Sequence, residues 1–455
     1  MKTITTTNPA NKKIIKEYTL HTQDEVNKIL IDTNEAFQIN RKTPIEERSK
    51  LMHKAADLLE ERQDLLASTM TNEMGKTFSS AQAEVGKCAW VCRYYADNAE
   101  AFLADEIIET DASKSYISYQ PLGVILAVMP WNYPLWQVFR FAAPTLMAGN
   151  TALLKHASNV PESALHIEKI FLDAGFPKNS FSTLLISSDA VEGILENSVV
   201  KAATLTGSGP AGQAVASASG KNIKKTVLEL GGSDPYLILA DADLDHAAEQ
   251  CTTSRLLNAG QSCIGAKRFI VVEEVYDDFL QKFKEKMASS IMGDPMKAVA
   301  LGPMARYDLR DEVHEQVIES VDKGAKLILG GKIPDSIGAY YPPTILTNVS
   351  PGMPAYEDEI FGPVASVIKV EDEAEAIRIA NDTAFGLGSC VFTQDKERGE
   401  KIAREELQAG CCFVNHYVKS DPRLPFGGIK TSGYGRELSY YGIREFVNIK
   451  TVFVN

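Results

Sequence analysis

The chain has 455 residues, of which 44% are hydrophobic and 24% are charged, and these proportions exclude wholesale disorder. Its length corresponds to about three average domains, which is enough to bury a large core. With 47 basic and 60 acidic residues, the net charge is −13. Because nucleic acids and membrane surfaces are anionic, we expect neither as a partner.

Nothing in the sequence is typical of a secreted or membrane protein. The longest apolar run, Gly123–Met129, is far too short to span a bilayer, and Met1–Lys13 is too polar for a signal peptide. Seven cysteines are an odd and sparse set for this length, which favours a reduced, cytoplasmic protein over a disulfide framework. No CxxC or HExxH motif occurs, so we expect no metal site.

The first hundred residues are predicted to be helical. Thr43–Glu46 has the pattern of a capping box with Pro44 at the first helical position, and it predicts a helix that continues through Leu59. A second helix is predicted over residues 79–104. Lys114–Gln120 then alternates polar and apolar residues, as a half-buried strand does.

From Gly123 onward, short apolar runs alternate with helical segments. Continuous apolar strands separated by helices indicate a parallel sheet covered on both faces, with ligand sites at the carboxyl ends of its strands. Gly149, Gly175 and Gly220 lie where helix ends are expected. The predicted strands are Val124–Met129, Ala152–Leu154, Thr183–Ile186, Ala202–Leu205, Thr226–Leu228 and Tyr236–Leu239, and the helices include Glu162–Asp173 and Ala211–Ser219.

A second α/β unit is predicted over residues 266–415. Its strands are Phe269–Val272, Lys326–Leu329 and Val364–Val370, and its helices are Val275–Ile291, Asp308–Lys323 and Glu373–Asn381. The final segment, Glu445–Val454, is predicted to be a strand that pairs either with residues 114–120 or with another subunit.

The segment Thr206–Gly212 contains a literal GxGxxG between an apolar strand and a helix. A loop in this position can bind a dinucleotide pyrophosphate through its backbone N–H groups. The alternative is that the glycines only form a tight turn. Pro210 removes one N–H donor, which weakens the dinucleotide interpretation.

Cys263 lies among small and polar residues in the glycine-bearing turn Asn258–Gly265, where a thiol is accessible. A thiolate in such a place is a potent nucleophile. We interpret the other cysteines as small core hydrophobes, and these are Cys88, Cys92, Cys251, Cys390, Cys411 and Cys412.

Two further polar residues lie at predicted strand ends. Glu229 stands between leucines, where burial would raise its pKa toward that of a general base; the alternative is a surface glutamate in a turn. Asn132 is held between Pro130 and Pro134, where its amide could donate to an oxyanion. The alternative there is a simple proline-bracketed loop.

In this order, the segments resemble the aldehyde dehydrogenase superfamily over nearly the whole chain. The matching motifs are PWNYP at 130–134, LLK at 153–155, TGS at 206–208, LELGG at 228–232, GQSC at 260–263, EIFGP at 359–363 and PFGGIKTSGYGRE at 425–437. Within the superfamily, Lys155–Val160, Leu228–Pro235 and Val418–Gly428 resemble the short bacterial succinate-semialdehyde dehydrogenases of 4-aminobutyrate degradation.

The resemblance implies an aldehyde dehydrogenase-like α/β fold in three parts. These are a Rossmann-type NAD(P)-binding domain (1–102 and 123–231), an α/β catalytic domain (232–430), and an oligomerisation β-ribbon with the C-terminal strand (103–122 and 431–455). Because the exposed edges of such a ribbon favour pairing with another subunit, we expect a homodimer or homotetramer.

The resemblance also implies a mechanism. Cys263 attacks the aldehyde, the Asn132 amide and the Cys263 N–H hold the oxyanion, and hydride loss to the nicotinamide leaves a thioester. Glu229 then activates the water that hydrolyses this thioester.

By the same resemblance, the cofactor-binding residues are Trp131, Lys155, Ser158, Gly207, Ser208, Gly212, Glu359 and Phe361. Many NAD-specific relatives carry a glutamate at the position of Ser158, where it repels a 2′-phosphate. We therefore expect NADP to be accepted, with NAD left open. His156 replaces the proline usual in the family.

For the substrate, the resemblance implies an aldehyde with a remote carboxylate, such as succinate semialdehyde. The expected contacts are Arg140, Trp136 and Ser420, although Arg140 could instead form a surface ion pair. Relatives carry a second arginine where this chain has Leu257, and Arg423 or Lys419 could replace it.

Several alternatives remain open at this stage. One is a broad-specificity enzyme or one for another ω-carboxylated semialdehyde such as glutarate semialdehyde, and another is acylating oxidation with coenzyme A. A cofactor-free cysteine hydrolase would need a histidine near Cys263, and none is close in sequence. A binding protein that keeps the fold is the non-enzymatic alternative.

Overall fold

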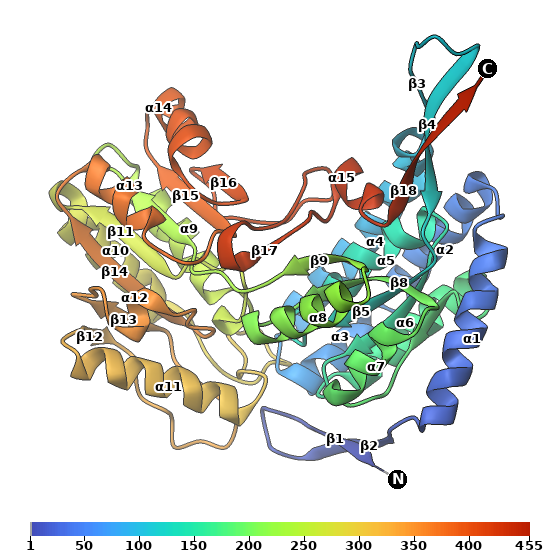
Figure 1. Cartoon of the computed structure of the whole chain (residues 1–455). Helices are drawn as coiled ribbons and strands as arrows, with labels where there is room; N and C mark the ends of the chain where they lie inside the picture. The colour runs from blue at the N-terminus through green and yellow to red at the C-terminus, as the bar shows by residue number, and fades with distance from the viewer. Residues whose placement is uncertain (1) are drawn as a thin grey trace.

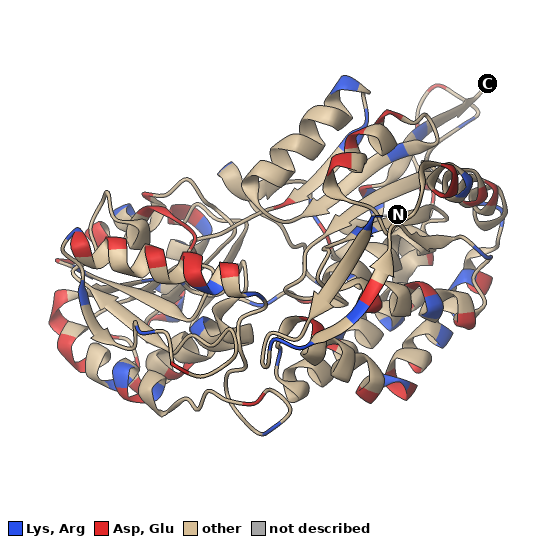
Figure 2. Cartoon of the chain, turned by 90° about the horizontal axis from the view of Figure 1, so that it is seen from below, with Lys and Arg blue, Asp and Glu red and all other residues tan. Residues whose placement is uncertain are grey.

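The computed structural model describes residues 2–455, which form two α/β lobes and a projecting β-ribbon (Figure 1). The predicted α/β class is confirmed. Figure 2 shows most charged residues on the outer helices and few on the strands between them. No helix within residues 2–455 is long and apolar enough to cross a membrane.

One lobe is built on a six-stranded sheet of order β17-β9-β8-β5-β6-β7. Neighbouring strands are parallel except for β17, which pairs antiparallel with β9. The predicted parallel sheet is therefore confirmed, with shifts of a few residues at strand ends and one correction. The strand predicted at Tyr236–Leu239 is β10 (Pro235–Ile238), which lies in the sheet of the other lobe and not in this one. Its strands are β5 (Val124–Met129), β6 (Thr151–His156), β7 (Phe181–Thr183), β8 (Val200–Thr206), β9 (Lys225–Glu229) and β17 (Gly433–Tyr434).

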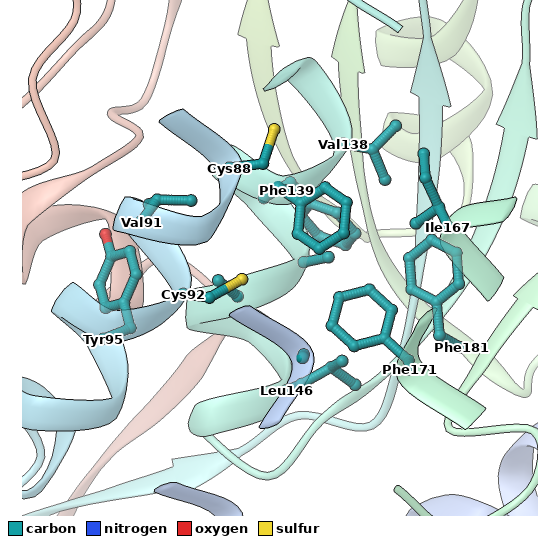
Figure 3. Close-up of a cluster of buried hydrophobic side chains, with 14 of the residues drawn as sticks. Cys88, Val91, Cys92, Tyr95, Val138, Phe139, Leu146, Ile167, Phe171 and Phe181 are labelled. Carbon is teal, nitrogen blue, oxygen red and sulfur yellow. The ribbon is translucent and has the colours of Figure 1, made fainter. Parts of the chain in front are cut away.

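Helices pack around this sheet because its strands are buried on both faces. Figure 3 shows part of this core, where Phe139, Phe171 and Phe181 gather beside Cys88 and Cys92. The helices of this lobe are α1 (Gln23–Asn40), α2 (Ile45–Glu61), α3 (Gln63–Met74), α4 (Phe78–Phe102), α5 (Trp136–Met147), α6 (Pro161–Ala174), α7 (Val191–Glu196), α8 (Gly209–Lys221) and α15 (Ser439–Arg444), with the 3-10 turn η1 (Ser188–Ala190).

The other lobe holds a seven-stranded sheet of order β12-β13-β14-β11-β10-β15-β16, parallel except for the β12–β13 pair. Its strands are β10 (Pro235–Ile238), β11 (Arg268–Val272), β12 (Lys326–Leu329), β13 (Thr344–Thr347), β14 (Val364–Val370), β15 (Gly388–Phe392) and β16 (Cys411–Val414). Its helices are α9 (Leu244–Leu256), α10 (Tyr276–Ser289), α11 (Tyr307–Asp322), α12 (Pro354–Glu357), α13 (Glu373–Asn381) and α14 (Lys396–Lys401). Short turns complete it, namely η2 (Leu257–Gly260), η3 (Glu273–Val275), the π-helical η4 (Ile402–Glu406) and η5 (Lys430–Ser432).

The C-terminal strand β18 (Val447–Val454) pairs antiparallel with β4 (Lys114–Pro121), which resolves the two alternatives for its partner within one chain. The short strand β3 (Glu106–Ile107) pairs on the other side of β4. This three-stranded ribbon projects from the body, and the C-terminus lies near its tip (Figure 1).

Three further details of the sequence prediction are wrong. Residues 3–19 form an antiparallel hairpin, β1 (Thr3–Thr7) with β2 (Ile14–Thr19), because their threonine and isoleucine pattern favours strands over helix. Thr43 does not cap α2: Pro44 is the N-cap, and the Thr43 hydroxyl donates to the Ile39 carbonyl. Gly220 lies inside α8, which ends one residue later.

The other two glycines predicted at helix ends lie there. Gly175 is a left-handed C-cap at φ +102°, and Gly149 has φ +93° just after α5.

The predicted burial of the cysteines holds for four of the six. Cys88, Cys92, Cys251 and Cys390 are buried as predicted, whereas Cys411 and Cys412 on β16 are only half-buried.

Candidate active site

Cys263 follows a backbone segment held in an unusual conformation. Asn258 and Ala259 both have φ near +54°, and Gly260 has φ +76°. Such left-handed residues persist only when neighbours impose them. Here the Asn258 amide donates to the Asn132 carbonyl at 2.8 Å and to the Gln261 carbonyl at 3.1 Å. The loop that presents the thiol is therefore fixed by the turn after β5.

The half-buried Cys263 thiol lines a cleft of about 480 Å³. Burial raises the pKa of this thiol to about 12, while the nearby positive charges of Arg140 and Lys267 oppose the shift. The thiol is therefore neutral near pH 7, and a base must receive its proton when it attacks a substrate.

Lys267, four residues after the cysteine, holds the same loop from the other side. Its ammonium donates to the Ser262 and Cys263 carbonyls at 2.9 and 2.8 Å and lies 3.3 Å from the Glu359 carboxylate. Lys267 was not predicted from the sequence as a site residue. The only available signal was a lysine directly before the buried strand β11.

Glu229 ends β9 and is buried, so the burial predicted from its flanking leucines is confirmed. Neither of its carboxylate oxygens has a hydrogen-bond partner within residues 2–455. Desolvation raises its pKa well above the usual value, although the Arg140 charge opposes this. A carboxyl group with a raised pKa can exchange a proton near neutral pH, as a general base must.

The glycines after Glu229 allow three motifs to meet. A Cβ atom on Gly231 would overlap the Glu359 carboxylate, and one on Gly232 would lie 2.8 Å from the Cys263 carbonyl oxygen. The Gly232 N–H donates to Glu359 at 3.0 Å. The LELGG segment therefore requires glycine because the Glu359 and Cys263 loops pass so close to it.

The Asn132 amide donates to the Gln261 carbonyl at 3.2 Å, so this side chain reaches the cysteine loop. His156 holds the turn that carries it. Its Nε2 lies 2.8 Å from the Pro134 carbonyl, and its Nδ1 accepts the Ala157 N–H at 2.9 Å. Burial lowers the pKa of His156 to about 4, so this neutral ring ties the end of β6 to the turn.

The GxGxxG segment opens α8 beside β9. Ser208 is the N-cap residue, but its side chain makes no capping bond, so the first N–H groups of the helix remain available to an anion. A Cβ atom on Gly212 would lie 2.6 Å from Leu230, so glycine is needed for the helix to pack against this loop. The Gly207 N–H donates to the Glu229 carbonyl at 3.0 Å.

Lys155, at the end of β6, is buried and donates to the Ser188 hydroxyl at 3.3 Å, with no carboxylate at ion-pair distance within residues 2–455. Ser158 is exposed nearby in sequence. Trp131 and Phe361 meet edge to face at 5.8 Å, although they come from opposite lobes. An unpaired cation, an open helix N-terminus and an aromatic pair suit a dinucleotide with an extra phosphate.

Arg140 lines the Cys263 cleft from α5, but its guanidinium is engaged. It forms an ion pair with Glu437, donates to the Thr206 hydroxyl at 3.4 Å and stacks 4.6 Å from the Phe426 ring centre. Only 2% of the side chain is exposed, so this is not the surface ion pair considered as an alternative. Its contact with a substrate stays a prediction.

Trp136 and Ser420 also line the cleft, and between them lies a residue that sequence analysis missed. The Lys87 ammonium donates to the Ser420 hydroxyl at 2.8 Å and lies 4.2 Å from the Trp136 ring centre. Leu257 lines the same cleft. Lys87 is one of several lysines on helices in the first hundred residues, and no local pattern sets it apart.

Within residues 2–455, no cluster of three histidine, cysteine or acidic side chains could hold a metal ion.

Comparison with known proteins places this geometry in a family. Residues 1–452 match the aldehyde dehydrogenase family. The chain is 52% identical over 452 residues to a Synechocystis sp. protein named "Probable succinate-semialdehyde dehydrogenase", NADP(+), with 99% of both chains covered. It is also 52% identical over 456 residues to succinate-semialdehyde dehydrogenase (NADP(+)) 1 of Mycobacterium ulcerans, again with 99% coverage of both.

Comparison with solved structures points to the same family. The succinic semialdehyde dehydrogenase of Streptococcus pyogenes, in complex with NADP+, superposes with a TM-score of 0.97 at 40% identity over 99% of both chains. Gox0499, whose structure addresses cofactor and substrate selection, superposes with a TM-score of 0.98 at 40% identity over 100% of both chains. The chain therefore belongs to the aldehyde dehydrogenase family.

Proposed function

We propose that this enzyme oxidises succinate semialdehyde to succinate with NADP+, through a thiohemiacetal and a thioester on Cys263. The observation that carries the proposal is full-length identity of 52% to relatives named for this activity, in a chain whose cysteine lines a cleft with buried cations. A cleft of this kind suits an aldehyde that ends in a carboxylate.

In the first step the Cys263 sulfur bonds to the aldehyde carbon, and the thiol proton passes to Glu229 through water. Glu229 suits this role because its raised pKa allows it to hold a proton near pH 7. The carbonyl oxygen becomes an oxyanion, which the Asn132 amide and the Cys263 N–H would stabilise.

Bound NADP+ supplies the hydride acceptor that converts the adduct into a thioester. Glu229 passes the first proton on to bulk water and becomes a carboxylate again. It then removes a proton from a second water molecule while the oxygen of that water attacks the thioester carbon. The carbon–sulfur bond breaks, the acid leaves, and the thiolate takes the proton from Glu229, which regenerates the thiol. Because Glu229 is buried and not in open solvent, it can activate one water molecule locally.

For the cofactor, we propose that Lys155 and Ser158 receive the adenosine ribose and its 2′-phosphate, and that Gly207, Ser208 and Gly212 border the pyrophosphate. Trp131 would also lie beside the pyrophosphate, Glu359 would hold the nicotinamide ribose, and Phe361 would pack on the nicotinamide ring. Ser158→Glu tests this, because its carboxylate would repel the 2′-phosphate. We expect kcat/KM for NADP+ to fall at least about tenfold, with little change for NAD+. An equal loss with both cofactors would contradict the assignment.

The substrate assignment is tested with a panel of succinate semialdehyde, glutarate semialdehyde and butanal, followed by absorbance of reduced nicotinamide. A preference for succinate semialdehyde supports the proposal, and equal rates with butanal overturn it. A preference for glutarate semialdehyde would reassign the substrate. Product analysis with coenzyme A present distinguishes the acylating alternative, which would give an acyl thioester in place of free acid.

We also propose that the ribbon joins subunits in a homodimer or homotetramer, and that the three predicted domains work as units. Strand β18 is an edge strand with exposed Ile449 and Phe453, and an unpaired apolar edge favours association. Analytical ultracentrifugation would decide between monomer, dimer and tetramer.

We place the enzyme in the cytoplasm, because all seven cysteines are free.

A further inference from the structure

We propose that Lys87, together with Ser420, binds the distal carboxylate of the substrate and supplies the positive charge that position 257 lacks. This inference rests on the proposed function, since it requires a substrate with such a carboxylate. It assigns a specificity-determining role to a residue that no sequence motif contains.

Three separate segments bring the parts of this candidate subsite together. Lys87 comes from α4, Trp136 opens α5, and Ser420 lies in the loop after β16. The three line one cleft with Cys263. The indole face supports the ammonium at 4.2 Å, and the Ser420 hydroxyl, 2.8 Å away, can turn its proton toward a second acceptor. The pair therefore offers two donors to one carboxylate.

The neighbouring acid does not neutralise Lys87. Glu84, one helical turn away, forms an ion pair with Lys76 and accepts the N–H groups of Leu135 and Trp136, each at 2.9 Å. These contacts use Glu84 to hold Lys76 and to cap the start of α5. No carboxylate lies within ion-pair distance of Lys87 in residues 2–455.

The other cations of the cleft differ from Lys87 in this respect. Arg140 is paired with Glu437, and Arg423 with Asp421 at 2.7 Å. Lys419 has no carboxylate partner in the described chain, but it is exposed to water. Lys87 is thus the cleft cation that is partly buried and still lacks a counter-ion among the described residues.

A partly desolvated ammonium without a counter-ion is unfavourable, and a ligand carboxylate would relieve this cost. Burial and the Arg140 charge lower the pKa of Lys87 to about 8, while Cys88, Glu84 and Asp421, which also face it, act in the opposite direction. Lys87 is therefore mostly charged at pH 7 and ready to pair with an anion.

The test compares Lys87→Met with the parent enzyme on succinate semialdehyde and on butanal, which has the same number of carbons but no carboxylate. We expect KM for succinate semialdehyde to rise at least about 30-fold and KM for butanal to change less than about threefold, because only the first loses a charge-assisted hydrogen bond. Lys87→Arg, which keeps the charge, should recover most of the loss.

The pH dependence of KM provides a second readout, which can be measured in the parent enzyme without removing the Lys87 side chain. In the parent enzyme, KM for succinate semialdehyde should rise as pH increases above about 8, because Lys87 loses its proton. KM for butanal should not follow this rise, and Lys87→Arg should abolish it.

The outcomes separate the two proposals. If the parent enzyme does not prefer succinate semialdehyde to butanal, the proposed function fails. If the parent enzyme shows this preference and Lys87→Met keeps it, the role of Lys87 is overturned while the function stands. Should Lys87→Met fail to fold, the parent pH profile and Lys87→Arg still decide the question.

Discussion

The two cations that line the Cys263 cleft, Arg140 and Lys87, have opposite surroundings. Arg140 forms an ion pair with Glu437, and its charge lowers the pKa of both Glu229 and Cys263 relative to what burial alone would give. Lys87 has a serine hydroxyl and an indole as neighbours but no carboxylate at ion-pair distance among the described residues. The charge of Arg140 is neutralised within the protein, whereas the charge of Lys87 is available to a ligand.

This difference predicts that the two ends of the cleft have different functions. A buried ion pair holds its members in place and shifts the pKa values of groups beside it, whereas an unpaired, partly buried cation is stabilised most when an anion binds. The end near Cys263 and Glu229 would then carry chemistry common to all aldehydes. The end near Lys87 and Ser420 would select among them.

Removing the nucleophile should have the largest effect and should not distinguish substrates. We expect Cys263→Ala to lower kcat at least about 10⁴-fold for succinate semialdehyde and butanal alike, because both need the covalent adduct. Steady-state absorbance measures this, with NADP+ binding by calorimetry as the control for folding. Turnover at the parent rate would refute the covalent mechanism.

Replacing the base should have the next largest effect, again with no preference for either aldehyde. Glu229→Gln should lower the steady-state rate about 10²- to 10⁴-fold, the usual contribution of a general base. Because Glu229 is proposed to act in both steps, the first turnover of reduced cofactor should slow as well. A rate within a few-fold of the parent would exclude Glu229 as the base.

The same residue predicts a pH profile. Since desolvation raises the pKa of Glu229, its carboxylate fraction grows as pH rises above the ordinary glutamate range, and kcat should rise with it. Glu229→Gln should remove this rise. An unchanged profile in the variant would assign the titration to another group.

The smallest effect is expected at the rim, where Arg423→Ala serves as the matched control for Lys87. The side chain of Arg423 is 68% exposed and paired with Asp421, so water and salt screen its charge strongly. We therefore expect KM for succinate semialdehyde to change less than about fivefold. A larger loss in this variant than in Lys87→Met would move the carboxylate site to the rim.

Local sequence patterns were sufficient for much of the fold. The strands Lys326–Leu329 and Val364–Val370 and the helix Glu373–Asn381 are observed with the predicted bounds, because apolar periodicity and turn residues specify them locally. The N-terminal hairpin was missed because its two short strands have few apolar residues to reveal their period.

For the candidate site, too, some features follow from local sequence and others only from packing. By itself, the sequence determined which residues could carry chemistry, because the motifs around Cys263, Glu229 and Asn132 have specific composition and spacing. Only the tertiary structure decided which charges are already paired. Lys87 and Ser420 are separated by 333 residues, so no local pattern could reveal their contact, and the ion pair that occupies Arg140 likewise forms only when distant segments meet. Charge compensation depends on distances of a few ångströms between such segments, and packing alone sets those distances.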